Sequence, residues 1–289
     1  MKFLFITLFP EQIEQAAGHS IIQRAVNKGL VEISCINPRE FTHDVHRTVD
    51  DTPFGGGAGM VLKPEPMVAA IRKAKEQLPN ARVIAMCPGG RTLKQSIVEE
   101  YAHCGQDFII VCGHYEGFDE RIFHWVDEKL SIGDYVLTGG EMPALIVMDA
   151  IARFIPGVLG KLVSAEEDSF STGLLEYPQY TRPVNFEGLE VPEVLRGGNH
   201  ALIADWRLQE SLKATYFLRP DLLTEEQLRF IEKPLPYKMK KSQRKFWEEL
   251  RSKIAAAKAD LAAKEAALAS AEAQNSEVEQ EEAYPKEGE

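Results

Sequence analysis

Three short turns rich in glycine have residue types that suit the binding of a small ligand. They comprise residues 87–91 (CPGGR), 113–117 (GHYEG) and 138–141 (TGGE), and each follows a short apolar run. In an open α/β sheet, ligands bind beyond the carboxyl ends of the strands, where several loops converge. Glycine in such loops lets backbone amides come close to a ligand. The turns predict a ligand site, but none has the glycine spacing of a dinucleotide or P-loop nucleotide site.

A fourth glycine-rich stretch, residues 53–60 (PFGGGAGM), follows the acidic pair Asp50 and Asp51. One interpretation is a flexible hairpin tip. The other is a backbone that accommodates a base or a phosphate, with the Asp50 carboxylate accepting hydrogen bonds from the N1–H and N2–H₂ edge of guanine. The residues alone leave both interpretations open.

Two further polar residues could take part in proton or charge chemistry. Asp168 lies in a polar stretch, residues 161–173, and Arg153 ends the helical pattern before it, although such residues are most often solvated surface charges. His43 and His46 are close in sequence, but no additional ligand at a suitable spacing completes a metal site. The four cysteines contain no C-x-x-C pair, so neither a disulfide framework nor a zinc cluster is expected.

Residues 1–160 alternate short apolar runs with helical patterns and are expected to form one domain. The expected strands are residues 2–8, 31–36, 82–87, 108–112 and 134–137. The expected helices are residues 13–28, 67–77, 93–103 and 142–154, with Gly29 ending the first and a Thr92–Gln95 capping box at the third. Strands that alternate with helices of this length are typical of a mostly parallel sheet covered on both faces. The predicted fold class is therefore α/β.

The remainder of the chain has little strand signal. Residues 161–173 lack periodicity and are expected to form a mobile interdomain linker. Residues 174–250 are expected to form a small helical domain, with helices at 205–217 and 225–232 and a Thr224–Gln227 capping box. Residues 251–289 are an Ala- and Glu-rich tail, in which 255–273 is expected to be a solvated helix and 275–289 to be disordered.

The composition excludes several classes of protein. A hydrophobic content of 44% and a charged content of 27% are typical of a globular protein. No apolar run approaches the ~20 residues that span a bilayer, and the apolar opening is too short for a signal peptide, so a cytoplasmic location is expected. The net charge of −11 argues against a uniformly basic nucleic-acid coat. Residues 229–253 nevertheless hold nine basic residues against three acidic ones, as either a mixed-charge helix or a phosphate-contacting surface.

Four strings that occur in order carry a resemblance to a known family. They are VDDTPFGGGAGM at 49–60, CGHYEG at 112–117, SIGDYVLTGGE at 131–141 and EDSF at 167–170. Together they closely resemble the bacterial tRNA (guanine-N1)-methyltransferases, a family of the SPOUT superfamily. The resemblance covers roughly residues 1–245 and does not extend to the Ala- and Glu-rich tail.

The resemblance implies a SPOUT-type sheet with a deep trefoil knot, and an obligate homodimer with its active sites at the subunit interface. It implies an enzyme that transfers a methyl group from S-adenosylmethionine to N1 of the guanosine immediately 3′ of the tRNA anticodon. Magnesium is also implied, without ligands that can be named. By match, the methyl donor would be bound by Met86, Pro88, Gly113, Tyr115, Glu116, Gly117, Ile132, Gly133, Tyr135, Leu137, Gly139 and Gly140.

The same resemblance assigns roles to the polar residues. Guanine N1 is a poor nucleophile until its proton leaves, and Asp168 matches the expected general base. Arg153 matches the residue expected to stabilise the negative charge that develops on the guanine ring. Asp50, Gly59 and Ser169 match positions that would contact substrate. The helical domain would bind the anticodon arm, and the linker would order over the site when tRNA binds.

Three alternatives remain for the function. One is a SPOUT-type enzyme that acts on a different RNA nucleotide or atom. Another is a non-catalytic RNA-binding module, although the retained Tyr115, Glu116, Gly117, Asp168 and Arg153 argue against it. The third is an enzyme of small nucleotides, which the missing P-loop and dinucleotide signatures make remote.

Overall fold

The computed structural model describes residues 1–160 and 168–282 of the chain. The chain divides into two compact units, Met1–Glu167 and Asp168–Glu289. The expected linker 161–173 therefore lies, over its first seven residues, outside the described part.

The first unit is built on a five-stranded sheet whose strand order is β2-β1-β6-β5-β7. Every pairing between neighbouring strands of this sheet is parallel, which confirms the predicted α/β class. The strands are β1 (Lys2–Ile6), β2 (Glu32–Ile36), β5 (Arg82–Thr92), β6 (Phe108–Val111) and β7 (Glu128–Ser131). Since parallel strands end at the same edge, the turns that follow β5, β6 and β7 converge there.

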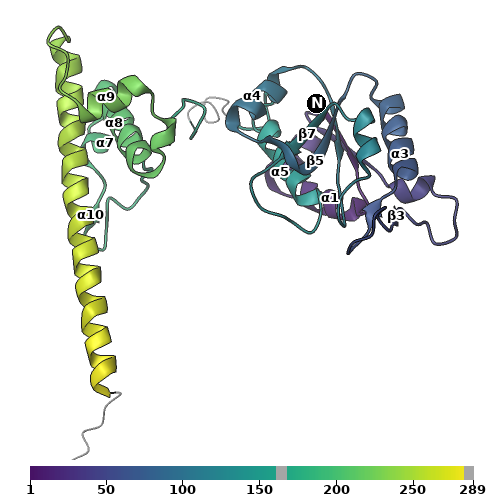
Figure 1. Ribbon diagram of the computed structural model, residues 1–289. Coiled ribbons are helices and arrows are strands. Elements are labelled where there is room, and N and C mark those ends of the chain that lie inside the picture. Colours follow the sequence, from purple (N-terminus) through teal and green to yellow (C-terminus); the bar gives the residue numbers. More distant parts are fainter. Residues whose placement is uncertain (161–167, 283–289) are drawn as a thin grey trace, which may run out of the picture. The chain divides into compact units, whose positions relative to one another are not determined.

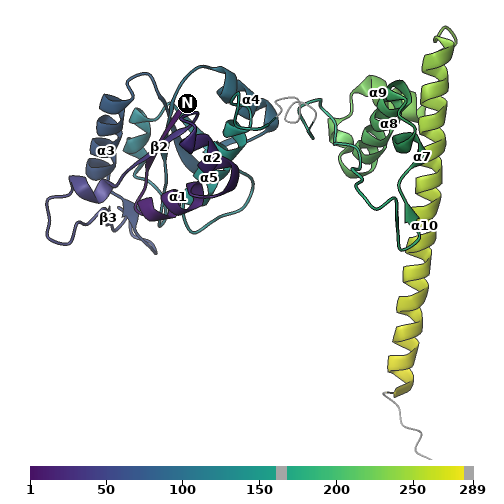
Figure 2. The same cartoon turned by 180° about the vertical axis from the view of Figure 1, so that it is seen from behind.

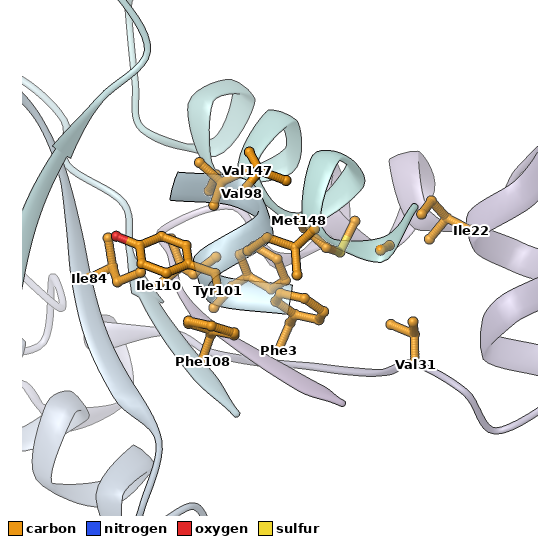
Figure 3. Packing of buried hydrophobic residues seen from close by; sticks show 14 of the residues in the cluster. Phe3, Ile22, Val31, Ile84, Val98, Tyr101, Phe108, Ile110, Val147 and Met148 are labelled. Carbon is orange, nitrogen blue, oxygen red and sulfur yellow. The ribbon is translucent and has the colours of Figure 1, made fainter. Parts of the chain in front are cut away.

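Helices cover both faces of this sheet because side chains alternate between the faces along each strand. Phe3 and Phe5 of β1 belong to the core beneath α1 (Pro10–Ala17), α2 (Ser20–Asn27), α4 (Gln95–His103) and α5 (Glu141–Ala152). Leu4 and Ile6 face the opposite core, which α3 (Pro64–Gln77) covers. Figures 1 and 2 show α3 on one side of the sheet and α2, α4 and α5 on the other. Figure 3 shows Phe3, Phe108 and Tyr101 packed below Val147 and Met148 of α5.

The predicted strand at 134–137 is wrong. The last strand is β7, which buries Leu130 and Ser131, whereas residues 134–137 form an exposed loop in which Val136 is 83% exposed. Tyr135 and Val136 have high strand propensity, but residues 134–137 pair with no strand of the described sheet. The strand predicted at 82–87 continues instead to Thr92, with a register shift between Met86 and Arg91.

Two predicted helix boundaries also differ from the structure. The helix predicted at 13–28 is two helices: the first ends at Ala17, and the second begins at Ser20, whose φ is 52°. The Thr92–Gln95 capping box is absent: Thr92 is the last residue of β5 and the cap of α4 is Lys94. Gly29 does end the first helical pattern, with a φ of 69° that glycine adopts readily.

A short antiparallel hairpin lies beside the turn that follows β6 and contains the fourth glycine-rich stretch. It pairs β3 (Asp50–Asp51) with β4 (Val61–Leu62), and the intervening loop holds residues 53–60. Four glycines of this loop have positive φ, as a hairpin tip requires.

The second unit is mainly helical. Its longer helices are α8 (His200–Leu218), α9 (Glu225–Glu232) and α10 (Lys241–Glu282), beside α7 (Glu193–Arg196) and a hairpin of β8 (Asn185–Phe186) and β9 (Leu189–Glu190). Their small core consists of Leu174, Leu212, Leu223, Ile231, Leu250 and Ile254. The Thr224–Gln227 capping box of α9 is confirmed, with both reciprocal hydrogen bonds in place.

The long helix α10 crosses the predicted boundary between residues 250 and 251, and Figure 1 shows it as one continuous ribbon. Leu250 and Ile254 tie its first part to the helical core. The helix predicted at 255–273 lies within it. The disorder predicted from residue 275 is wrong as far as Glu282, where α10 ends. Residues 275–282 (NSEVEQEE) are rich in glutamate, a good helix former, and continue the helix.

Candidate active site

A cavity of about 420 Å³ lies at the edge of the sheet where β5, β6 and β7 end. This volume falls in the usual range for a small-molecule site. All twelve residues expected to bind the methyl donor line it, and they are Met86, Pro88, Gly113, Tyr115, Glu116, Gly117, Ile132, Gly133, Tyr135, Leu137, Gly139 and Gly140. The three glycine turns therefore form one cavity.

The turn after Met86 is produced by a bulge in β5. Met86 and Arg91 both pair with Leu130 of β7, so residues 87–90 loop out of the ladder toward the cavity. A Cβ atom on Gly90 would overlap the backbone of Leu130, and glycine is what allows the strand to return to β7. Bulges of this kind re-aim a strand next to a site.

The two other turns meet each other through glycine. The Gly140 amide donates to the carbonyl oxygen of Gly113 at 2.8 Å. A Cβ atom on Gly140 would lie 2.6 Å from the Gly113 nitrogen and 2.7 Å from Cα of Cys112. Only a residue without a side chain permits this approach of two backbones, so the wall of the cavity depends on Gly140.

Two tyrosines give the cavity an aromatic rim. Tyr115 and Tyr135 are 51% and 55% exposed, which leaves both rings accessible to a ligand. Tyr115 has a φ of 59°, a conformation that is strained for a tyrosine and typical of functional turns. Gly133 has a φ of 145°, and a Cβ atom there would lie 2.7 Å from the Tyr135 ring. Glycine therefore lets that ring fold back over the loop.

The hairpin β3–β4 is attached to the Tyr115–Gly117 turn by the backbone. The amide of Glu116 donates to the carbonyl of Met60, and the amide of Leu62 donates to the carbonyl of Gly117, both at 2.9 Å. Gly59 lies so close to Glu116 that a Cβ atom would overlap its carboxylate. The structure thus brings Gly59 to the cavity rim, while Asp50 pairs with Leu62 at the base of the hairpin.

The two predicted catalytic residues belong to different units. Arg153 is half-buried and caps the C-terminal end of α5 in the first unit. Asp168 begins the second unit, followed by Ser169, whose Oγ accepts a hydrogen bond from the amide of Glu176 at 2.9 Å.

The segment after Asp168 is folded against the helical core. The amide of Phe170 donates to the carbonyl of Leu174 at 2.7 Å, and the guanidinium of Arg219 lies 5.7 Å from the Phe170 ring. The amide of Leu175 donates to Oγ of Thr215 at 2.9 Å. The described part of the predicted linker is thus an ordered turn.

Several basic residues in 229–253 have structural partners. Arg251 donates to the carbonyls of Phe230 and Lys233, and Arg244 donates to the carbonyl of Pro236. Lys253 pairs with the nearly buried carboxylate of Glu210. Lys238, Lys240 and Lys241 are exposed around the start of α10 and are better placed to contact phosphate.

Sequence reasoning missed several lining residues. Some belong to β7, which was predicted too late in the chain, and others lie within the recognised turns. The missed residues are Cys87, His114, Phe118, Glu120, Phe123, Lys129, Leu130, Ser131, Val136, Thr138 and Pro143. Residues 128–131 (EKLS) carry no alternating pattern of apolar and polar residues that would have located this strand.

The cysteines and the carboxylates do not form a metal centre in the described residues. No group of three or more histidine, cysteine, aspartate or glutamate side chains is close enough there to hold an ion. All four cysteines are free thiols. Burial raises the pKa of Cys35 to about 12, and burial also raises the pKa of Cys112 above its usual range. Within the described ranges, no helix has the length and apolar character of a membrane span.

Comparison with known proteins identifies the family. The family model described as tRNA (guanine-1)-methyltransferase TrmD matches residues 1–225. The tRNA (guanine-N(1)-)-methyltransferase of Bacillus subtilis (strain 168) is 50% identical over 238 residues, which cover 80% of this chain and 98% of that protein. The protein of the same name from Geotalea uraniireducens (strain Rf4) is 53% identical over 229 residues, covering 79% and 92%. The chain belongs to the TrmD family of tRNA (guanine-1)-methyltransferases.

Proposed function

We propose that this protein transfers the methyl group of S-adenosylmethionine to N1 of the guanosine at position 37 of tRNA, immediately 3′ of the anticodon. The relatives named above carry the name of this reaction class. The observation that carries the proposal is the single cavity lined by all twelve residues matched to donor binding.

The chemistry of the cavity fits such a donor. Apolar side chains such as Met86, Ile132 and Leu137 suit the faces of an adenine ring. Glycine-rich turns leave backbone amide and carbonyl groups near the ligand, where they would bind ribose and methionine groups. When bound, the donor supplies an electrophilic methyl group on a positively charged sulfur.

The acceptor chemistry falls to Asp168 and Arg153. N1 of guanine becomes nucleophilic when the Asp168 carboxylate takes its proton. The electron pair left on N1 forms the bond to the methyl group, while the C–S bond breaks and leaves a neutral thioether. Arg153 stabilises the charge that spreads to O6 before transfer. Asp50, Gly59 and Ser169 contact the flipped guanine or its neighbour.

The proposal includes a homodimer with active sites at the subunit interface. Next to the cavity, Val136 and Leu137 of the rim and Met142 and Ile146 of α5 are between 44% and 83% exposed. Neighbouring apolar side chains at the surface are typical of an interface, and a second copy of the chain would cover them. In such a dimer, Asp168 acts at the cavity of the opposite protomer.

The proposal also includes the deep trefoil knot. Two close backbone approaches are compatible with it: Gly140 against Gly113, and Gly90 against Leu130. Both approaches bring together segments that are far apart in sequence, and the knot itself is carried by the family resemblance.

Magnesium, tRNA docking and location complete the proposal. The described residues contain no group of three or more His, Cys, Asp or Glu side chains that could hold magnesium, so the ion would reach the site with ligands from elsewhere, such as water or the RNA. The helical unit binds the anticodon arm, with Lys238, Lys240 and Lys241 near phosphates. Like its tRNA substrate, the enzyme works in the cytoplasm.

The test is methyl incorporation from labelled S-adenosylmethionine into tRNA transcripts that carry guanosine or adenosine at position 37, with added magnesium. Wild-type protein should label only the guanosine transcript. The variant Asp168→Ala should bind S-adenosylhomocysteine normally yet lose activity by at least ~10²-fold. Equal activity in the variant would remove Asp168 from its role. Donor binding without any incorporation by the wild type would point to a different RNA substrate.

A further inference from the structure

The buried carboxylate of Glu141 lies beside the cavity and accepts two hydrogen bonds. Glu141 is the first residue of α5 and is 2% exposed. Its Oε1 accepts from Oγ1 of Thr7 at 2.6 Å, and its Oε2 lies 2.7 Å from Nε2 of His114. A buried carboxylate is costly unless such donors satisfy it, so the three side chains form one unit.

These three side chains come from three segments of the chain. Thr7 follows β1 and is itself fixed, because its amide donates to the carbonyl of Ile36 and its Oγ1 accepts from the amide of Phe9. His114 lies in the turn after β6, and Glu141 follows the turn after β7. One carboxylate therefore connects a central strand of the sheet to two walls of the cavity.

The ring of His114 is where those two walls touch. A Cβ atom on Gly139 would overlap the His114 ring, and the two residues also form a backbone bridge. The ring of Phe9 packs edge-on against His114, with 5.0 Å between ring centres. Since a carboxylate only accepts, Nε2 of His114 carries the proton, and this hydrogen bond fixes the ring orientation.

We propose that Glu141 is a positioning residue for methyl transfer. By holding His114 against Gly139, it keeps both glycine turns in the single arrangement that orients the donor. Glu141 does not line the cavity, so it acts through His114 rather than by touching the reacting atoms. The inference rests on the proposed function, since it takes this cavity as the methyl-donor site. A misplacement of about 1 Å in such a site costs on the order of 10²-fold in rate.

The first test replaces His114 in two matched ways. His114→Gln keeps an N–H donor near the position of Nε2, whereas His114→Phe keeps a ring of similar size without a donor. The full-length variants are compared by calorimetric binding of S-adenosylhomocysteine and by single-turnover methyl transfer at saturating tRNA. His114→Gln should keep an affinity and a rate about tenfold or more above those of His114→Phe, because only the glutamine can still donate to Glu141. A packing role for the ring predicts the opposite order.

A second pair keeps the inference testable if His114→Phe does not fold. Thr7→Ser keeps the hydroxyl donor to Glu141, and Thr7→Val removes it with little change in shape. Thr7→Val should weaken donor binding and slow transfer relative to Thr7→Ser. Normal affinity and rate in Thr7→Val, with only a lower unfolding temperature, would overturn the proposal.

The two proposals fail in different ways. A wild-type protein that binds S-adenosylhomocysteine but transfers no methyl group contradicts the proposed function, while the affinities of the variants still test the role of Glu141. A wild-type protein that does neither contradicts both.

Discussion

Replacing Gly140 by alanine should damage the first unit and its cavity together. The new Cβ atom would lie 2.6 Å from the Gly113 nitrogen and 2.7 Å from Cα of Cys112. Ordinary contacts between such atoms are about 3.5–4.0 Å, so the two backbones must separate by roughly 1 Å. That movement also stretches the 2.8 Å hydrogen bond from the Gly140 amide to the Gly113 carbonyl.

The expected cost follows from these two effects. Overpacking costs about 1–3 kcal/mol, and the weakened hydrogen bond adds about 1 kcal/mol. The unfolding free energy of Gly140→Ala should therefore fall by about 2–4 kcal/mol. For a unit of this size, each kcal/mol lowers the unfolding temperature by about 2–4 °C, so a decrease of roughly 5–15 °C is expected.

Gly89→Ala is the matched control, because a Cβ atom there meets only Sγ of Cys87 at 4.0 Å. The assay is thermal unfolding with and without S-adenosylhomocysteine, together with calorimetric binding. Gly140→Ala should also bind the ligand at least about tenfold more weakly, since the walls of the cavity move apart. If the two variants have equal unfolding temperatures and affinities, the close approach of Gly140 to Gly113 is not what shapes the cavity.

Two further predictions concern the helical unit. Thr215→Val should lower its unfolding free energy by about 1–3 kcal/mol in urea, because the Leu175 amide loses its acceptor; Thr215→Ser should not. Burial alone would raise the pKa of Glu210, but the ammonium groups of Lys213 and Lys253 outweigh it and hold the pKa below its usual 4.5. A lowered pKa stabilises the folded state above the unfolded pKa and loses that effect as the pH falls through the folded pKa. The unfolding temperature of the wild type, followed by tryptophan fluorescence, should therefore fall more steeply on acidification than that of Glu210→Gln; parallel curves would contradict this.

Much of the fold could be predicted because its signals are local. The apolar run at Lys2–Ile6 and the capping box at Thr224 each specify an element without reference to the rest of the chain. The position of β7 could not be read in this way, since Glu128–Ser131 has only two buried residues and becomes a strand by pairing with β5. Its neighbours Tyr135 and Val136 have higher strand propensity but no partner strand.

The candidate site likewise contains residues that the sequence could predict and residues whose role depends on the fold. Glycine turns and a family resemblance located the twelve lining residues, but the tertiary role of Glu141 had no sequence signal. Its partners Thr7 and His114 are 134 and 27 residues away, and only the folded sheet brings them together. A single glutamate after two glycines is otherwise an ordinary helix start.

The strand order also constrains the sequence of events during synthesis. β6 lies between β1 and β5, although both of these leave the ribosome before it. Until residue 111 has emerged, β1 can pair only with β2, and β5 has no neighbour on either edge. The nascent chain therefore carries β5, which is apolar over residues 83–86, with both edges unpaired for at least the time needed to add the 19 residues from Thr92 to Val111. The sheet is completed when β6 inserts between β1 and β5, rather than by the addition of strands at one edge. Pairing between segments that are far apart in sequence is slow.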